Sequence, residues 1–317
     1  MSGDRAVIGR LLDELATGWA TGDLSKVGPA FDDRSRLISA QHGTASGTDA
    51  ILAALGADTR DRGFIHRATN RYIGIDGNRA ATSFYLFGLM HDGRDKAFLF
   101  GTTIIALLER VESRWRIDDI RIQAMWSKGD PQMASHWLHF PGDRGWQLGA
   151  PPPVIVSELH APWHVLPDLP APDDLQEALH ELYARYAFAV DQNDIGLLVS
   201  AYAKDVEGGF APLGNLSGRD EVVGMLKNFR HLAPFWQHFG EVVAVQDEGD
   251  GQHARLIIGR IVPDRPVDES GRTIYAAHYQ LRAVRKGGNW HICWSDYRPG
   301  WFTQDTVPAF DIGRPTS

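Results

Sequence analysis

Three side chains in the C-terminal half of the sequence have the chemistry of a general base and its helpers: Tyr186, Asp191 and His238. An imidazole oriented by a carboxylate titrates near neutral pH and can remove a proton next to an electron-withdrawing group. Asp191 falls near the end of an expected helix, from which its carboxylate could turn toward a sheet and orient His238. The Tyr186 hydroxyl could stabilise a developing oxyanion. These residues predict proton abstraction followed by loss of water or another leaving group, with neither a metal nor an organic cofactor.

The last expected strand supplies candidate substrate-binding residues. Strand alternation places five of its residues on one face, and these are Trp290, Ile292, Trp294, Asp296 and Arg298. If that face lines a cavity, Asp296 and Arg298 are polar groups in an otherwise aromatic pocket. Such a pocket suits a bulky, aromatic or polycyclic small molecule that carries a few oxygens.

Each of these residues also has a purely structural interpretation. Tyr186 continues an apolar helical stripe and could be a core residue whose hydroxyl is satisfied. His238 could be an ordinary strand residue at a cavity wall. Arg298 could form a surface or inter-domain ion pair instead of binding substrate, and the case for Asp296 is weaker still. Asp23 and Asp194 are expected to be helix N-caps.

The elements that position these residues occur twice in the chain. The heptapeptide that begins Ser46-Gly47-Thr48-Asp49 has a counterpart that begins Ser217-Gly218-Arg219-Asp220, 171 residues later. Each copy has helical periodicity first and strand periodicity afterwards, and each Ser-x-x-Asp is expected to cap a short third helix. We therefore expect two tandem α+β domains, each a cone-shaped barrel with helices on the concave face of a curved antiparallel sheet. The expected boundaries are 1–130 and 173–317, joined by a Pro-, Trp- and His-rich connector at 131–172.

Composition limits the other classes of function. The net charge of −8 and the pI near 5.9, without a basic cluster, argue against a nucleic-acid partner. We also expect no membrane partner, because no apolar run approaches the ~20 residues of a membrane span. The single cysteine, Cys293, fits a reducing compartment, and no signal peptide is recognisable, so a cytoplasmic location is expected. His136-x-x-His139 is too weak a pattern to predict a metal site.

The order of elements, with Tyr186 and Asp191 late in a first helix and His238 on the following strand, resembles the nuclear transport factor 2-like superfamily. The nearest group is its SnoaL-like branch, which includes dehydratases, cyclases and related lyases such as scytalone dehydratase. The resemblance covers roughly residues 4–130 and 173–305. It implies that Tyr186, Asp191, His238 and Arg298 occupy the positions of catalytic groups in dehydratases of this kind.

The same resemblance implies alternatives. A related isomerase or cyclase would use the same base, and the fold also hosts non-catalytic ligand-binding and accessory proteins. In the first copy Leu15 and Ala20 replace Tyr186 and Asp191, so we expect no dehydratase-type site there, although His66, with His42 or Asp23, could form a different one. Proteins resembling this family commonly pair through their sheets, so we expect the two copies to form an internal pseudo-dimer, with further homo-oligomers left open.

Overall fold

The computed structural model describes residues 2–60, 63–93, 95–141, 156–232 and 237–312. Contacts within the chain divide it into two compact units, Met1–Leu169 and Pro170–Ser317, here called the first and the second domain. The described residues of the expected connector up to Leu169 therefore pack with the first domain, and residues 142–155 of that connector lie outside the described part.

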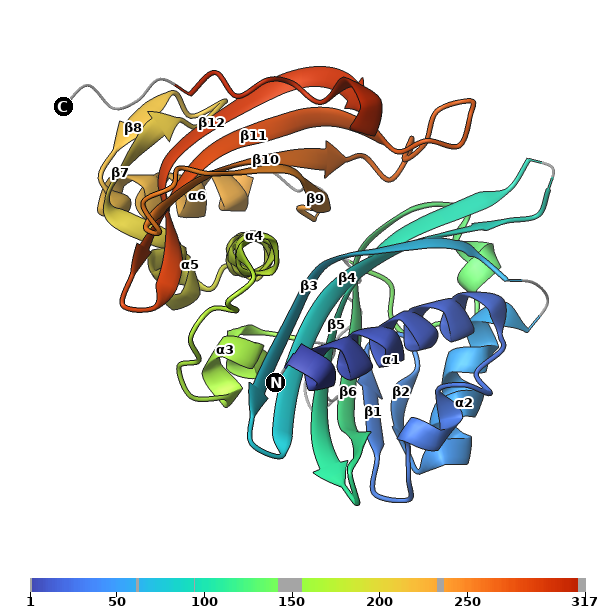
Figure 1. Cartoon of the computed structure of the whole chain (residues 1–317). Coiled ribbons are helices and arrows are strands. Elements are labelled where there is room, and N and C mark those ends of the chain that lie inside the picture. The colour runs from blue at the N-terminus through green and yellow to red at the C-terminus, as the bar shows by residue number, and fades with distance from the viewer. Residues whose placement is uncertain (1, 61–62, 94, 142–155, 233–236, 313–317) are drawn as a thin grey trace. The chain divides into compact units, whose positions relative to one another are not determined.

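The first domain begins with a long helix and continues as a sheet. Its helices are α1 (Ser2–Thr21), α2 (Thr48–Gly56) and the short α3 (Pro162–Val165). Its strands are β1 (Arg36–Ser39), β2 (Gly43–Ser46), β3 (Ile65–Asp76), β4 (Arg79–His91), β5 (Ala97–Val111) and β6 (Arg114–Gly129). Figure 1 shows α1 and α2 on one side of the curved sheet.

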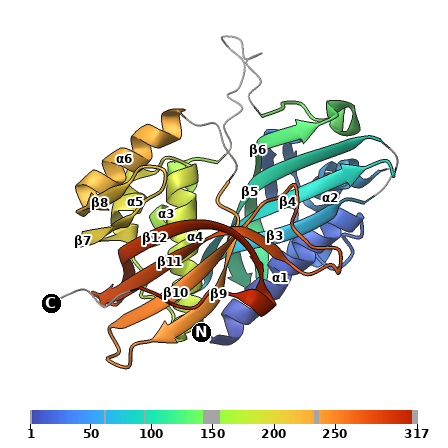
Figure 2. The same ribbon diagram turned by 90° about the horizontal axis from the view of Figure 1, so that it is seen from above.

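The second domain repeats this order. Its helices are α4 (Leu175–Asp191), α5 (Ile195–Ala201) and α6 (Arg219–Leu232). Its strands are β7 (Tyr202–Gly209), β8 (Asn215–Ser217), β9 (Gly240–Asp247), β10 (His253–Ile261), β11 (Ile274–Lys286) and β12 (Asn289–Thr303). The helices lie against the curved sheet in Figure 1, and Figure 2 shows α5 and α6 beside the short strands β7 and β8.

The two sheets have the same strand order, β2-β1-β6-β5-β4-β3 and β8-β7-β12-β11-β10-β9. The expected antiparallel meander is present in the four long strands of each sheet. The two short strands of each sheet were not expected, and β1 and β7 pair in parallel with β6 and β12. Both sheets are therefore mixed, and the expectation of wholly antiparallel sheets is wrong in this respect.

Helix starts in the second domain follow the expected capping chemistry. The Asp174 carboxylate accepts from the backbone N–H of Glu177 (2.8 Å) at the start of α4. The Asp194 carboxylate accepts from that of Leu197 (2.9 Å) at the start of α5. Asp23 instead accepts from the backbone two residues on, and a turn followed by a short 3-10 helix (Gly28–Ala30) stands in place of the expected α-helix.

The third helix of each copy begins differently from the expectation. Gly47 and Gly218 precede α2 and α6 with φ of 80° and 90°, a left-handed conformation that favours glycine. Gly47 makes no side-chain cap, and the backbone N–H of Ser217 donates to the Glu221 carboxylate (2.9 Å). The repeated glycine, and not the serine before it, thus sets the entry into these helices.

The helices bury an apolar stripe against each sheet. In α4 the buried residues include Leu179, Leu182, Tyr183, Tyr186 and Val190, spaced as one face of a helix. The first domain encloses a continuous apolar cluster that includes Leu15, Trp19, Phe84, Phe100 and Ile104. No helix among the described residues is long and apolar enough to cross a membrane.

Candidate active site in the second domain

Asp191 and His238 form a buried pair at the end of α4. The Asp191 Oδ1 lies 2.7 Å from Nδ1 of His238, and its Oδ2 lies 2.7 Å from the backbone nitrogen of His238. The Asp191 side chain is fully buried, whereas that of His238 is 10% exposed. A carboxylate accepts hydrogen bonds, so Nδ1 carries the hydrogen and the neutral ring has its lone pair on Nε2. The expected pairing of Asp191 with His238 is therefore present in the structure.

Tyr186 lies beside this pair. Its ring contacts that of His238 edge to face, with 5.8 Å between centroids, and it also packs against Tyr279 and Tyr202. Burial, together with the neighbouring phenols of Tyr279 and Tyr202, raises the pKa of Tyr186 well above its usual value. The hydroxyl therefore stays protonated over the whole physiological range, and it forms a hydrogen bond with Tyr279 that a substrate oxygen would have to replace.

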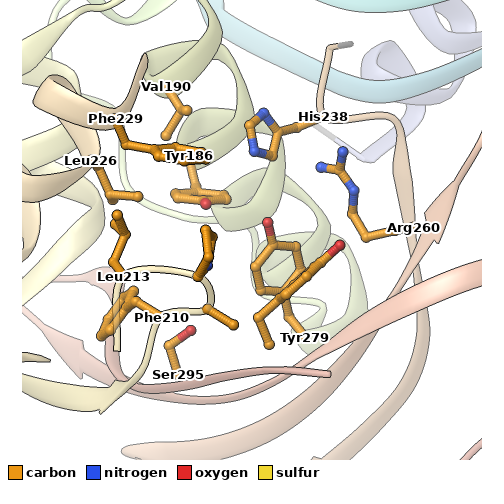
Figure 3. A pocket seen from close by; sticks show the side chains of 13 residues that line it. Tyr186, Val190, Phe210, Leu213, Leu226, Phe229, His238, Arg260, Tyr279 and Ser295 are labelled. Carbon is orange, nitrogen blue, oxygen red and sulfur yellow. The ribbon is translucent and has the colours of Figure 1, made fainter. Parts of the chain in front are cut away.

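A cavity of about 230 Å³ adjoins the three residues. Its walls come from α4, the segment after β7, α6, and strands β10 to β12 (Figure 3). The lining is Tyr186, Val190, Phe210, Ala211, Pro212, Leu213, Leu226, Phe229, His238, Arg260, Tyr279, Ser295 and Tyr297. Most of these side chains are apolar or aromatic, so the polar groups stand out as the ones that can orient a ligand.

Arg260 and Tyr279 are two polar wall residues that sequence reasoning missed. The Arg260 Nη1 donates to the Tyr183 hydroxyl and its Nη2 to the Gln237 carbonyl, both at 3.4 Å. The Tyr183 hydroxyl in turn donates to the carbonyl oxygen of His238 (3.0 Å). A usable signal was the arginine near the end of β10, directly after the buried run Leu256–Gly259, because a charged residue next to buried apolar residues usually has a specific partner or role.

The expectation that five β12 residues share one face is wrong. In the pairing with β11, Trp294 lies opposite Arg282 and Ile292 lies opposite Ala283, with a register shift between them at Cys293. Because consecutive residues of β11 point to opposite faces, Ile292 and Trp294 also point to opposite faces. Past this bulge, the cavity is lined by Ser295 and Tyr297, from the other set of alternating residues.

The predicted substrate-binding residues of β12 consequently do not line this cavity. Trp290 is buried and Trp294 is partly exposed, and neither is part of the lining. Arg298 donates through Nε to Asp296 (2.6 Å) and also pairs with Asp311. The side chain of Arg298 is 35% exposed, in agreement with the surface ion-pair alternative.

The first domain has aliphatic residues at the corresponding positions. Four polar residues of the second-domain site have apolar counterparts in the first domain. The counterparts follow from the sequence offset between the copies and from the equivalent pairings of β10 with β11 and of β4 with β5. Leu15, Ala20, Leu86 and Ile104 stand in place of Tyr186, Asp191, Arg260 and Tyr279. His66 is retained, but within the described residues it has no carboxylate partner, and burial lowers its pKa.

The first domain instead has a buried carboxylate elsewhere, at Asp58. Oδ2 of Asp58 is 2.8 Å from Nε2 of His42 and accepts from Nε1 of Trp19 (2.8 Å). Oδ1 is 2.6 Å from Nε2 of His136 and accepts from Nε1 of Trp137 (2.7 Å). The Asp58 side chain is fully buried. Four N–H donors on two oxygens use the full acceptor capacity of a carboxylate, so Asp58 joins α1, the β1–β2 turn and the segment after β6.

This Asp58 network occupies the positions of the apolar cavity wall in the second domain. By the 171-residue offset, the matched pairs are Trp19 with Val190, His42 with Leu213 and Asp58 with Phe229. His42, Asp58 and His136 each offer a ligand atom within 4.8 Å of the others, yet both Nε2 atoms point at the carboxylate as hydrogen-bond donors. Of the three residues that could have formed a second site, His66, His42 and Asp23, His42 belongs to this network.

The chain belongs to the SnoaL-like domain family, whose model matches twice, at residues 2–121 and 174–295. The two matches cover well over half of the chain and confirm both the tandem repeat and the resemblance to the nuclear transport factor 2-like superfamily. No curated protein sequence matches the chain.

Similar solved structures each cover about two fifths of the chain. A hexachlorocyclohexane dehydrochlorinase, LinA-type3 from Novosphingobium barchaimii LL02, has 16% identity and a TM-score of 0.37, covering 40% of this chain and 90% of its own. A putative scytalone dehydratase from Novosphingobium aromaticivorans DSM 12444 has 14% identity and a TM-score of 0.35, covering 40% and 87%. The Kfla4162 protein from Kribbella flavida has 18% identity and a TM-score of 0.37, covering 42% and 98%.

Proposed function

We propose that the second domain is a lyase in which His238, oriented by Asp191, removes a proton from an oxygenated small molecule that then loses water or another leaving group. The observation that carries this proposal is the double hydrogen bond from His238 to Asp191 at the wall of a cavity. A ring held in this way presents a basic nitrogen in a fixed tautomer, which is the requirement for a general base.

The side chains of His238, Asp191 and Tyr186 can together carry out the elimination of water from a substrate. His238 takes the proton from carbon through Nε2 and becomes an imidazolium next to the Asp191 carboxylate, whose charge stabilises it. The same imidazolium can return the proton to a departing hydroxyl group, which then leaves as water. Tyr186, protonated at working pH, donates a hydrogen bond to a substrate oxygen.

The volume of the cavity limits the size of the substrate class expected from the sequence. A volume of about 230 Å³ lies below the ~300–1,000 Å³ typical of pockets for drug-sized ligands. The lining combines aliphatic and aromatic side chains with few polar ones. We therefore favour a compact aromatic or alicyclic substrate with one or two rings over a large polycyclic one.

Isomerisation by the same base is the second candidate. Among the described lining residues, His238 is the one side chain whose usual pKa lies near neutrality. A proton that it removes can therefore return either to a leaving group or to another carbon of the substrate. Solvent deuterium found in the product carbon skeleton without loss of water would identify the isomerase.

The test is a screen of hydroxylated one- and two-ring carbonyl compounds, followed by ultraviolet absorbance of conjugated products. The wild-type chain is compared with His238→Gln and Asp191→Asn. His66→Gln is the matched control, because it changes the equivalent histidine of the first domain. Turnover that vanishes in His238→Gln and persists in His66→Gln supports the proposal. Turnover unaffected by His238→Gln would show that His238 is not the base, and ligand affinity that falls in parallel with turnover would favour a binding protein instead.

We also propose a structural role for the first domain. Leu15 and Ala20 remove the hydroxyl and the carboxylate that the base needs, and Asp58 is fully engaged by its four donors. Substitution of Asp58 should therefore change the stability of the chain and leave the chemistry of the second domain unchanged.

A further inference from the structure

Arg260 brings a positive charge to the cavity wall without a carboxylate to balance it. Within the described residues it forms no ion pair, and its two hydrogen bonds to Tyr183 and Gln237 are long, at 3.4 Å each. Arg298, by contrast, is held by two carboxylates, Asp296 and Asp311. A guanidinium taken out of water is costly unless a negative charge or close hydrogen bonds compensate it. Arg260 is half-buried and has no direct carboxylate partner among the described residues, although the Asp191 carboxylate acts on it at longer range.

The surroundings keep Arg260 charged. Burial alone would lower the pKa of Arg260, but Tyr183, Tyr279, Tyr297 and Asp191 act in the opposite sense and hold it above its usual value. The carboxylate among these neighbours, Asp191, is already bonded to the ring and backbone of His238. Arg260 thus remains a cation in the wall of the cavity.

The position of Arg260 relative to the base defines what it can bind. The Tyr183 hydroxyl donates to the carbonyl oxygen of His238 and accepts from Arg260, so one phenol fixes both residues. Figure 3 shows the guanidinium and the imidazole at the same end of the cavity. In an enolisable carbonyl compound, the acidic C–H and the carbonyl oxygen are on adjacent carbons. With both side chains at one end of the cavity, a single substrate can present its C–H to His238 and its carbonyl oxygen to Arg260.

We propose that Arg260 is the oxyanion-binding residue of this site, and that the substrate is a carbonyl compound whose acidic C–H is next to the C=O group. This inference rests on the proposed function of His238. The C–H bond breaks as His238 takes the proton, and its electron pair forms a C=C bond while the carbonyl π electrons move to oxygen. Arg260 stabilises that oxygen anion through charge-assisted hydrogen bonds. The enolate then reforms the carbonyl and expels hydroxide from the next carbon, which leaves as water with the proton held by His238, so no oxidant or reductant is required.

The experiment uses 4-nitrophenol as an optical analogue of the enolate, because its phenolate form absorbs visible light and its phenol form does not. The full-length protein is titrated with this probe across the pH range in which the probe ionises. We expect binding to lower the pKa of the probe by about 1–2 units, the effect of an opposite charge in contact. Arg260→Gln should abolish this shift, Arg260→Lys should keep part of it, and the matched control Arg298→Gln should keep all of it.

A His238→Gln variant separates this inference from the proposed function. If Arg260 holds the anion, the shift persists in His238→Gln even though that variant has lost its base. A shift that is absent from the wild type, or that survives in a folded Arg260→Gln variant, overturns the inference. A pKa shift of the probe that is lost in His238→Gln but kept in Arg260→Gln also overturns the inference. An Arg260-dependent shift in a protein that catalyses no His238-dependent elimination would overturn the lyase proposal and leave the anion subsite standing.

Discussion

The Asp191 carboxylate binds His238 through both the backbone and the ring, with each of its two oxygens 2.7 Å from a nitrogen. The backbone bond fixes where His238 sits at the entry to β9, and the ring bond fixes how the imidazole is turned. Position and tautomer of the proposed base therefore depend on one residue at the end of α4.

Asp191→Asn should reduce turnover by a factor of about 10² to 10⁴, the usual contribution of a positioned acid–base group. An amide has one acceptor oxygen and one donor NH₂, so it cannot accept from both nitrogens of His238. The measurement is kcat with a substrate found in the screen, together with circular dichroism to confirm folding.

The control for this change is Asp194→Asn, three residues further along the chain. Asp194 caps α5, and asparagine is an equally good N-cap, so activity should be retained. Full activity in a folded Asp191→Asn variant would show that His238 does not need its carboxylate, which contradicts the proposed mechanism.

Tyr186→Phe should lower kcat by about 10- to 100-fold and change KM little, because one hydrogen bond to the developing charge is lost. The phenylalanine ring keeps the packing against His238 and Tyr279, so the fold should remain intact. Tyr275→Phe is the comparison, since its hydroxyl donates to Glu241 (2.8 Å) outside the cavity lining. Equal effects of the two substitutions would remove Tyr186 from the mechanism.

Asp58 should make the first domain sensitive to acid. Burial alone would raise the pKa of Asp58, but the His42 charge and the hydrogen bonds from His136, His42 and Trp137 hold it well below its usual value. Ionised Asp58 therefore stabilises the folded first domain at pH values above the pKa of an aspartate in the unfolded chain, near 4. This stabilisation is lost as the pH falls from there toward the lower pKa of Asp58 in the folded protein. Urea unfolding as a function of pH measures this loss.

Asp58→Asn should flatten that acid dependence and cost about 3–5 kcal/mol of unfolding free energy at neutral pH, as for other buried charged groups that lose a partner. The variant should keep the activity of the second domain. An unchanged pH dependence of unfolding would show that the Asp58 network contributes no acid-sensitive stability.

Arg298→Gln should leave activity unchanged and alter stability by at most about 1 kcal/mol, because pairs between exposed charges contribute little. Arg298 bonds Asp296 and Asp311 and is not part of the cavity lining. The readout is kcat/KM beside thermal unfolding. A large loss of kcat/KM in this variant would restore the role expected for Arg298 from the sequence.

The sequence was sufficient for the features that depend on local spacing. Tyr186 and Asp191 are five residues apart on one helix, so their relation is set by helix geometry, and the repeated glycine motif aligned the two copies. The partner histidine followed from the order of elements. The structure shows these relations as predicted because each depends on one element or on one repeated connection.

Other features depend on details that periodicity does not contain. A single extra residue at Cys293 reverses the faces of β12 beyond it, and no sequence pattern marks the bulge. The Asp58 network draws its members from positions 19, 42, 58, 136 and 137, which only the closed fold brings together. Arg260 was visible as a charge directly after an apolar run of β10, but its place beside His238 needed the strand order.

The two domains exchange polar and apolar residues at matching positions, and this has a consequence for comparing one domain with the other. The buried carboxylate lies at the end of α4 in the second domain (Asp191) and in the 3-10 helix after α2 in the first domain (Asp58). In each case, the other location is filled with hydrocarbon or aromatic side chains. The shared backbone fold therefore sets the volume of the domain interior. It does not set the position of the buried carboxylate, which differs between the two domains. A residue-by-residue transfer of functional roles from one half of the chain to the other would mislead, even though the two halves share strand order and register.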